Sequence, residues 1–106
     1  MWYAHHTADM KKRQASTTCP VAAVAELLSD TWTMLIIRDV LRGPQRFGTL
    51  AESLAGISTR TLTIKLHRLV EQGIITKKDT GYTITTQGRR LGRIIKAMSQ
   101  YGEQYL

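Results

Sequence analysis

The sequence is poor in several residue types, and each shortage argues against a class of protein. One cysteine, Cys19, and two prolines occur among 106 residues. A lone cysteine cannot form a disulfide within the chain, which is typical of a reducing compartment. No apolar run approaches the roughly 18 residues that a membrane-spanning helix needs. The first residues also lack the apolar core of a signal peptide. We therefore predict a cytoplasmic protein without a membrane partner.

Groups for catalysis and metal binding are also scarce. The sequence has three histidines, of which His5 and His6 are adjacent, and their spacing from Cys19 matches no standard metal site. It has no paired carboxylates and no glycine-rich phosphate loop. We predict that the protein is not an enzyme and needs no metal or cofactor.

Acidic residues are few relative to basic ones. Eight Asp and Glu stand against 15 Lys and Arg, which gives a net charge of +7. The excess lies in residues 46–106, with ten basic against four acidic residues. Such a surface favours polyanions, nucleic acid before acidic membranes. The alternative is a basic face that serves only solubility.

Apolar residues at helical spacing predict a mostly helical domain. One helix begins at Pro20, with Thr18 or Cys19 as its cap, and a second covers residues 31–43. A short third helix fits residues 47–55, and a fourth follows Ser58. Two short helices joined by a tight turn with glycine are a helix-turn-helix signature. The predicted buried residues are Val21, Val24, Ala25, Leu28, Trp32, Leu35, Ile36, Val40, Leu41, Leu50, Leu54, Leu62, Leu66, Leu69 and Val70.

The pattern then changes from helical to alternating. Residues 74–86 alternate around a turn at residues 79–81, which predicts a β-hairpin. Thr86 or Gln87 should then open a single last helix that runs toward Leu106. Its apolar residues form a stripe close to a heptad repeat: Leu91, Ile94, Ile95, Met98, Tyr101 and Tyr105.

The order helix, helix-turn-helix, hairpin is that of a winged helix. Several short motifs make the comparison specific: Cys19-Pro20, Trp32, Gly43-Pro44-x-Arg46-Phe47, Ile57-Ser58 and Tyr82-x-Ile84-Thr85-x-x-Gly88. With them, residues 19–95 resemble the HxlR-type family of bacterial and archaeal winged-helix transcription regulators. The resemblance implies a homodimeric DNA-binding regulator, and in some members a cysteine before the first core helix senses oxidants or electrophiles. The wing tip here, residues 78–81, is shorter than is typical of the family.

The predicted fold class is mostly α with a small β-hairpin, a winged helix-turn-helix with N- and C-terminal dimerisation helices. Residues 1–18 would be an N-terminal arm, 19–88 the DNA-binding domain and 89–106 the C-terminal dimerisation helix. An apolar stripe on a helix at the edge of a small domain needs a partner. We therefore expect a homodimer that binds double-stranded DNA.

The helix after Ser58 supplies the predicted base contacts. At about 100° per residue, Ile64 lies opposite the leucines of the core, on the side that also carries Arg60. An apolar side chain can contact the methyl group of thymine, and arginine can donate two hydrogen bonds to guanine. The alternatives for Ile64 are packing against a partner subunit or simple exposure.

Other candidates are predicted to contact the phosphate backbone. Hydroxyls and N–H groups at a helix N-terminus suit phosphate, and later basic residues on the same helix are better placed for phosphate than for bases. The predicted set is Arg46, Ser58, Thr59, Thr61, His67, Arg68, Lys77 and Lys78. For Arg46 the alternative is an ion pair with Asp39 or Glu52. For the two lysines it is a solvated hairpin edge.

Cys19 is the residue with the most distinctive chemistry. A thiol at a helix N-terminus feels the helix dipole, which favours the reactive thiolate. The alternative is a small buried hydrophobic residue. The predicted function is therefore a homodimeric regulator that binds a pseudo-palindromic operator and responds to redox state or to a ligand, with the effector unidentified. The competing hypothesis is a winged-helix module for protein–protein interaction without a DNA site.

Overall fold

The computed structural model describes residues 19–106, and the predicted arm at residues 1–18 lies outside them. The chain forms two compact units, one up to Asp30 and one from Thr31 to Leu106. In the first unit, helix α2 (Pro20–Leu27) begins with proline in its first turn. Cys19 is its cap, and its Sγ accepts a hydrogen bond from the backbone N–H of Ala22 at 3.5 Å.

Four residues in and just after α2 were predicted to be buried, and the prediction was wrong for three of them. Val21, Val24 and Ala25 are exposed, and only Leu28, just after the helix, is buried. The described part of this unit contains no second element on which these side chains could pack.

The second unit has the element order of a winged helix. Its helices are α3 (Thr31–Leu41), α4 (Phe47–Ser53), α5 (Thr59–Glu71), α6 (Thr86–Arg89) and α7 (Gly92–Tyr105), and its strands are β1 (Ile75–Lys78) and β2 (Gly81–Ile84). The strands form one antiparallel hairpin, with Ile75 opposite Ile84 and Lys78 opposite Gly81. The fold is thus mostly α with a small β-hairpin, as predicted.

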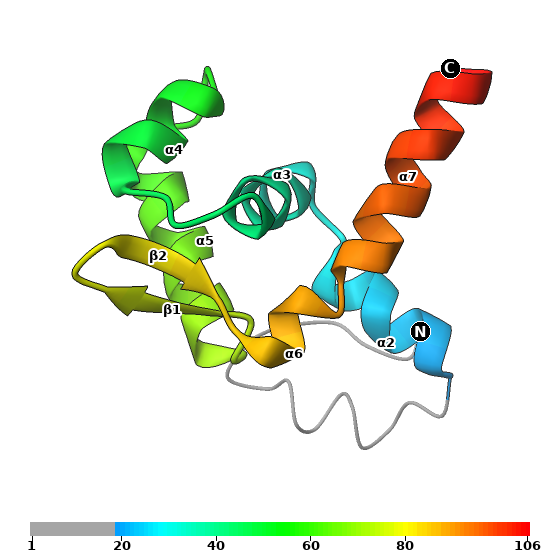
Figure 1. Ribbon diagram of the computed structural model, residues 1–106, viewed down its shortest axis with the longest axis horizontal. Coiled ribbons are helices and arrows are strands. Elements are labelled where there is room, and N and C mark those ends of the chain that lie inside the picture. Colours follow the sequence, from blue (N-terminus) through cyan, green and yellow to red (C-terminus); the bar gives the residue numbers. More distant parts are fainter. Residues whose placement is uncertain (1–18) are drawn as a thin grey trace. The chain divides into compact units, whose positions relative to one another are not determined.

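Helix α3 lies at the centre of this unit. It packs against α5, α7 and β2, with α4 and α5 on one side and α7 on the other (Figure 1). Because α3 has neighbours on several sides, it is buried on more than one face. Ile37, which was not among the predicted buried residues, is therefore fully buried, as are Ile36 and Val40. The predicted core residues Trp32, Leu35 and Leu41 are only half-buried.

The remaining core comes from the helix-turn-helix and the start of the hairpin. It consists of Leu50, Leu54, Leu62, Leu66, Leu69, Ile74 and Ile75. Val70 was predicted to belong to it but is exposed, because the leucine face of α5 already fills the contact with α3 and β1.

The prediction of a single last helix was wrong. Thr85 caps the short helix α6 by accepting a hydrogen bond from the N–H of Gly88, and α7 starts only at Gly92. A Cβ on Gly88 would come within 2.1 Å of the carbonyl oxygen of Ile74, so α6 is held against the start of the hairpin. Leu91 is buried after the break, and α7 then projects away from α6 (Figure 1).

Within residues 19–106, no single helix has both the length and the apolar character to cross a membrane, and only α2 and α3 taken together reach that length and composition. In the same residues, no group of three or more His, Cys, Asp or Glu side chains could hold a metal ion.

Candidate nucleic-acid interface

The start of α5 is fixed by a local hydrogen-bond network. The Oγ of Ser58 accepts a bond from the backbone N–H of Thr61 at 3.0 Å and donates one to the Oγ1 of Thr61 at 2.9 Å. The backbone bond from Thr61 makes Ser58 the cap of α5. The two hydroxyls lie within hydrogen-bond distance of each other at the exposed start of the helix.

One side of α5 is exposed along its whole length. Leu62, Leu66 and Leu69 face the core, while Thr59, Arg60, Thr63, Ile64, His67 and Arg68 are exposed. Ile64 retains 38% of its accessible surface, so it lies between basic and hydroxyl side chains rather than in the core. The mixed chemistry of this face, with Ile64 among donors and Val70 exposed near the end of the helix, suits the major groove.

The positive charge on this face is largely uncompensated. Within residues 19–106, neither Arg60 nor Arg68 makes an ion pair. The acidic neighbour Glu71 instead lies 3.4 Å from the Nε2 of His67, one turn earlier, and pairs with it when the imidazole is protonated. Both guanidinium groups therefore remain available to an anionic ligand.

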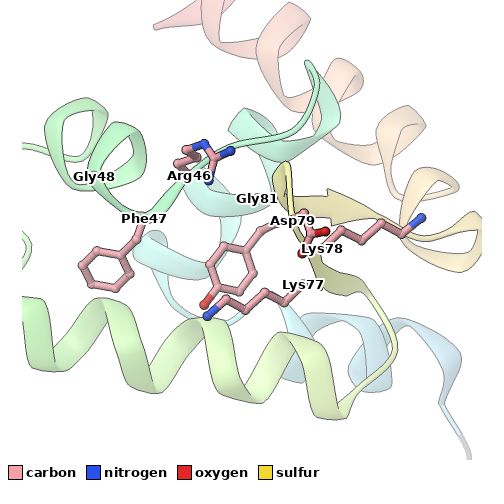
Figure 2. A pocket seen from close by; sticks show the side chains of 8 residues that line it. Arg46, Phe47, Gly48, Lys77, Lys78, Asp79 and Gly81 are labelled. Carbon is pink, nitrogen blue, oxygen red and sulfur yellow. The ribbon is translucent and has the colours of Figure 1, made fainter.

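A second basic region lies between the start of α4 and the hairpin. A surface pocket of about 590 Å³ is lined there by residues of both elements, among them Arg46, Lys77 and Lys78. Figure 2 shows the side chain of Arg46 coming from the start of α4 and that of Lys77 from β1. The alternative of an ion pair between Arg46 and Asp39 is not found among the described residues, because Asp39 pairs with other arginines. The structure thus brings together three residues predicted from distant segments.

The two lysines of the hairpin differ in direction. Lys77 stands opposite Tyr82, and its Nζ lies 5.7 Å from the centre of the tyrosine ring. The Lys78 ammonium group is directed away from that of Lys77 (Figure 2), as expected for successive residues of a strand. Only Lys77 therefore shares a face of the hairpin with Tyr82.

Two polar residues near this region were missed by sequence reasoning. Asp39 is 3% exposed, and its carboxylate accepts bonds from Arg38 Nε at 2.9 Å and Ser53 Oγ at 2.6 Å, with Arg42 at 3.6 Å. Gln45 donates from its Nε2 to the carbonyl oxygen of Asp39 at 3.0 Å. The bonds to Ser53 and from Gln45 tie the end of α3 to α4 and to the loop before it. Ser53 is fourteen residues from Asp39, and no local pattern marks this contact.

Gln45 also pairs with the wing through its backbone. Its N–H donates to the carbonyl of Tyr82 at 3.0 Å, and the N–H of Tyr82 donates back at 2.8 Å. Gly81, with φ of 117°, lies so close to Gln45 that a Cβ would come within 2.7 Å of the Gln45 oxygen. Only glycine fits this approach and this backbone conformation without strain.

The apolar stripe of α7 is uncovered in the single chain. Ile94, Met98, Tyr101 and Tyr105 are exposed, and the rings of the two tyrosines lie 4.9 Å apart. The basic residues of this region, Arg89, Arg90, Arg93 and Lys96, are exposed as well. Cys19 is exposed in the first unit, which argues against the alternative of a small buried residue.

The fold and this surface define a winged-helix transcription regulator. Residues 27–106 match the family model HxlR-like helix-turn-helix, and the chain belongs to this family. The recognition from the sequence is thereby confirmed, and regulators with a helix-turn-helix bind DNA.

The relatives agree with this assignment. An HTH-type transcriptional regulator of Synechocystis, sll1512, is 34% identical over 83% of this chain and 70% of its own length. The regulator Rv3095 of Mycobacterium tuberculosis is 37% identical over 81% of this chain, which spans only 58% of that relative.

Solved structures share the fold as well as part of the sequence. The crystal structure of quinone-bound YodB from Bacillus subtilis has a TM-score of 0.75 and 30% identity, and covers 82% of this chain and 100% of its own. The redox regulator HypR in its reduced form has a TM-score of 0.77 and 25% identity, with 81% of this chain and 92% of its own covered.

Proposed function

We propose that this protein is a homodimeric regulator that binds a pseudo-palindromic operator in double-stranded DNA by sequence. The observation that carries the proposal is the exposed face of α5, where Ile64 lies between Arg60 and Arg68, which make no ion pair within residues 19–106. A helix that binds a protein groove needs apolar anchors at i, i+4 and i+7. This face has a single exposed isoleucine among donors, which favours DNA over a protein partner.

Two side chains of α5 are assigned to base edges. Arg60 lies one turn before Ile64 on the exposed face and has no competing carboxylate within residues 19–106. Its guanidinium can donate to O6 and N7 of guanine, while Ile64 can contact a thymine methyl group. We therefore expect a G and a T at fixed positions of each half-site.

The other basic and hydroxyl residues are assigned to the phosphate backbone. Thr59, Thr61, His67 and Arg68 flank the base-reading residues on α5, and Arg46, Lys77 and Lys78 lie at the start of α4 and in the wing. Ser58 would contribute mainly by holding the first turn of α5, because its Oγ accepts the bond from the N–H of Thr61. Such contacts fix the register on DNA without reading sequence.

Dimerisation is assigned to α7. Its exposed apolar residues, Ile94, Met98, Tyr101 and Tyr105, lie on a helix that projects from the domain (Figure 1). A second copy could bury this surface by the same contacts in both directions, as in a two-fold interface. In this proposal residues 19–88 bind DNA, residues 89–106 dimerise, and residues 1–18 support the dimer.

Cys19 is proposed as a regulatory thiol. It is exposed, and it caps α2 through its sulfur, so oxidation would change the chemistry at the start of that helix. The similar proteins YodB and HypR, known in quinone-bound and reduced forms respectively, support a redox role. Operator affinity of the wild type and of Cys19→Ser, with and without a quinone, tests it. Equal affinity in all four conditions would leave Cys19 without a regulatory role.

The proposal as a whole is tested by selecting binding sites from random duplex DNA with the full chain. We expect a symmetric pair of half-sites whose centres lie about one helical turn, roughly 10 base pairs, apart. Sedimentation of the selected complex should show two chains per duplex. Selection of unpaired half-sites, or of no site, would contradict a symmetric DNA-binding dimer.

A further inference from the structure

We propose that Arg46 and Lys77 form a single seat for one phosphodiester group of the DNA backbone, and that Gln45 is the positioning residue that holds the two together. This inference rests on the proposed DNA-binding function and specifies one contact within it. Lys78, although it borders the same pocket, stands outside the seat.

The first argument is the composition of the pocket. Arg46 and Lys77 enter it from different elements, the start of α4 and strand β1 (Figure 2). Both side chains are exposed, and within residues 19–106 neither makes an ion pair. The two side chains thus supply two positive charges to the lining of one open pocket, and a phosphate bound there would neutralise them. A guanidinium and an ammonium group together can donate several charge-assisted hydrogen bonds to a phosphate.

The second argument is the contact between Lys77 and Tyr82. These residues are directly opposite in the hairpin, and the ammonium group lies 5.7 Å from the ring centre. A cation over an aromatic ring is attracted to its face. The ring therefore keeps the lysine on the pocket side of the hairpin and reduces the freedom that it would lose on binding. Within residues 19–106, Lys78 has no such aromatic neighbour, and it is directed the other way (Figure 2).

The third argument is the attachment of the wing to the loop before α4. Gln45 makes two backbone bonds to Tyr82 and a side-chain bond to the carbonyl of Asp39. Asp39 is buried and bonded to Ser53 at the far end of α4. Gln45 directly precedes Arg46, so these bonds fix the position of the Arg46 backbone relative to Lys77. Glycine at position 81 permits this close approach, because a Cβ there would meet the backbone oxygen of Gln45.

The pocket also contains a carboxylate. Asp79 lies in the hairpin turn and lines the same pocket. It opposes any anion there, so its neutralisation should strengthen binding if a phosphate occupies the seat. Asp79→Asn should therefore raise the affinity for DNA, whereas loss of either cation should lower it. The substitution changes only an exposed residue of the turn.

The experiment uses the full chain and operator duplexes in which one phosphate at a time is replaced by a neutral methylphosphonate. For the wild type, one position in each half-site should cost at least about tenfold in affinity. In Arg46→Gln and in Lys77→Gln, the methylphosphonate at that position should cause almost no further loss of affinity. The loss should persist in Lys78→Gln, the matched control with the same change in charge.

Gln45→Leu tests the positioning role, because it removes the amide and keeps every charge. We expect an unchanged dependence on salt, a weaker effect of the methylphosphonate, and reduced coupling between Arg46→Gln and Lys77→Gln in a double-mutant cycle. A protein that was merely less stable would lose affinity at all phosphate positions alike, and thermal unfolding of the variant monitors this. Unchanged coupling would overturn the role of Gln45.

Two further outcomes would overturn the seat itself while leaving DNA binding intact. One is that Arg46→Gln, Lys77→Gln and Lys78→Gln all lose the same affinity on every methylphosphonate duplex. The basic residues would then attract the DNA backbone in general and bind no particular phosphate. The other is binding of inorganic phosphate or a nucleoside monophosphate, at constant ionic strength, that requires Arg46 and Lys77 but leaves the affinity for the operator unchanged. That result would assign the pocket to a small phosphorylated molecule. Failure of the wild type to bind any duplex would instead contradict the proposed function.

Discussion

Ile64 offers a quantitative test of base recognition. Complete burial of an isoleucine side chain contributes about 1.5–3 kcal/mol, and 38% of Ile64 is exposed in the free protein. Covering that fraction with DNA should contribute about 0.6–1.1 kcal/mol per subunit. For a dimer on two half-sites the two contributions add, so Ile64→Ala should weaken operator binding by roughly seven- to fortyfold.

The sharper form of this test changes the DNA and not the protein. Replacing the contacted thymine by deoxyuridine removes one methyl group, worth about 0.8 kcal/mol, or roughly fourfold in each half-site. The wild type should lose this factor at one position per half-site, and Ile64→Ala should lose almost nothing there. The loss of affinity is measured by fluorescence anisotropy on operators in which deoxyuridine replaces each thymine in turn. If no position distinguishes wild type from Ile64→Ala, Ile64 does not read thymine.

Three further substitutions separate base reading, helix stability and dimerisation. Arg60→Ala should cost about 1–3 kcal/mol on the operator and relax the preference at one base pair, whereas equal losses on random DNA would refute base reading. Ser58→Ala should lower stability by about 1 kcal/mol, roughly 4–8 °C in Tm, with little change in DNA affinity per folded molecule. A large loss of affinity would instead mean that the hydroxyl binds phosphate. Met98→Glu with Tyr101→Glu should yield a folded monomer with sharply weaker operator binding, and a dimer in sedimentation would place the interface elsewhere.

The sequence predicted those parts of the fold that depend on local periodicity. The leucines of α5 recur at helical spacing, and Leu62, Leu66 and Leu69 are all buried. Alternation in residues 74–86 predicted the hairpin, and its register pairs Ile75 with Ile84. The prediction that a helix follows Ser58 rests on a local signal as well, because serine is a favoured cap, and Ser58 does cap α5.

Features that depend on tertiary contacts could not be predicted in this way. The break between α6 and α7 follows from the approach of Gly88 to Ile74, fourteen residues earlier. Asp39 appeared to be an ordinary charged residue of α3, but its partner Ser53 allows it to be buried. The same holds for Gln45, whose pairing with Tyr82 joins the loop before α4 to the wing and creates the pocket between them.

The central claim, sequence-specific binding of duplex DNA by a dimer, is tested most directly by a salt titration on two duplexes. Affinity is measured for the selected operator and for a scrambled duplex of equal length between about 50 and 200 mM salt. We predict a log–log slope that corresponds to roughly 6–10 neutralised phosphates, together with an operator affinity at least about 10³-fold higher than that of the scrambled duplex. A flat salt dependence, or equal affinity for both duplexes, would contradict the account.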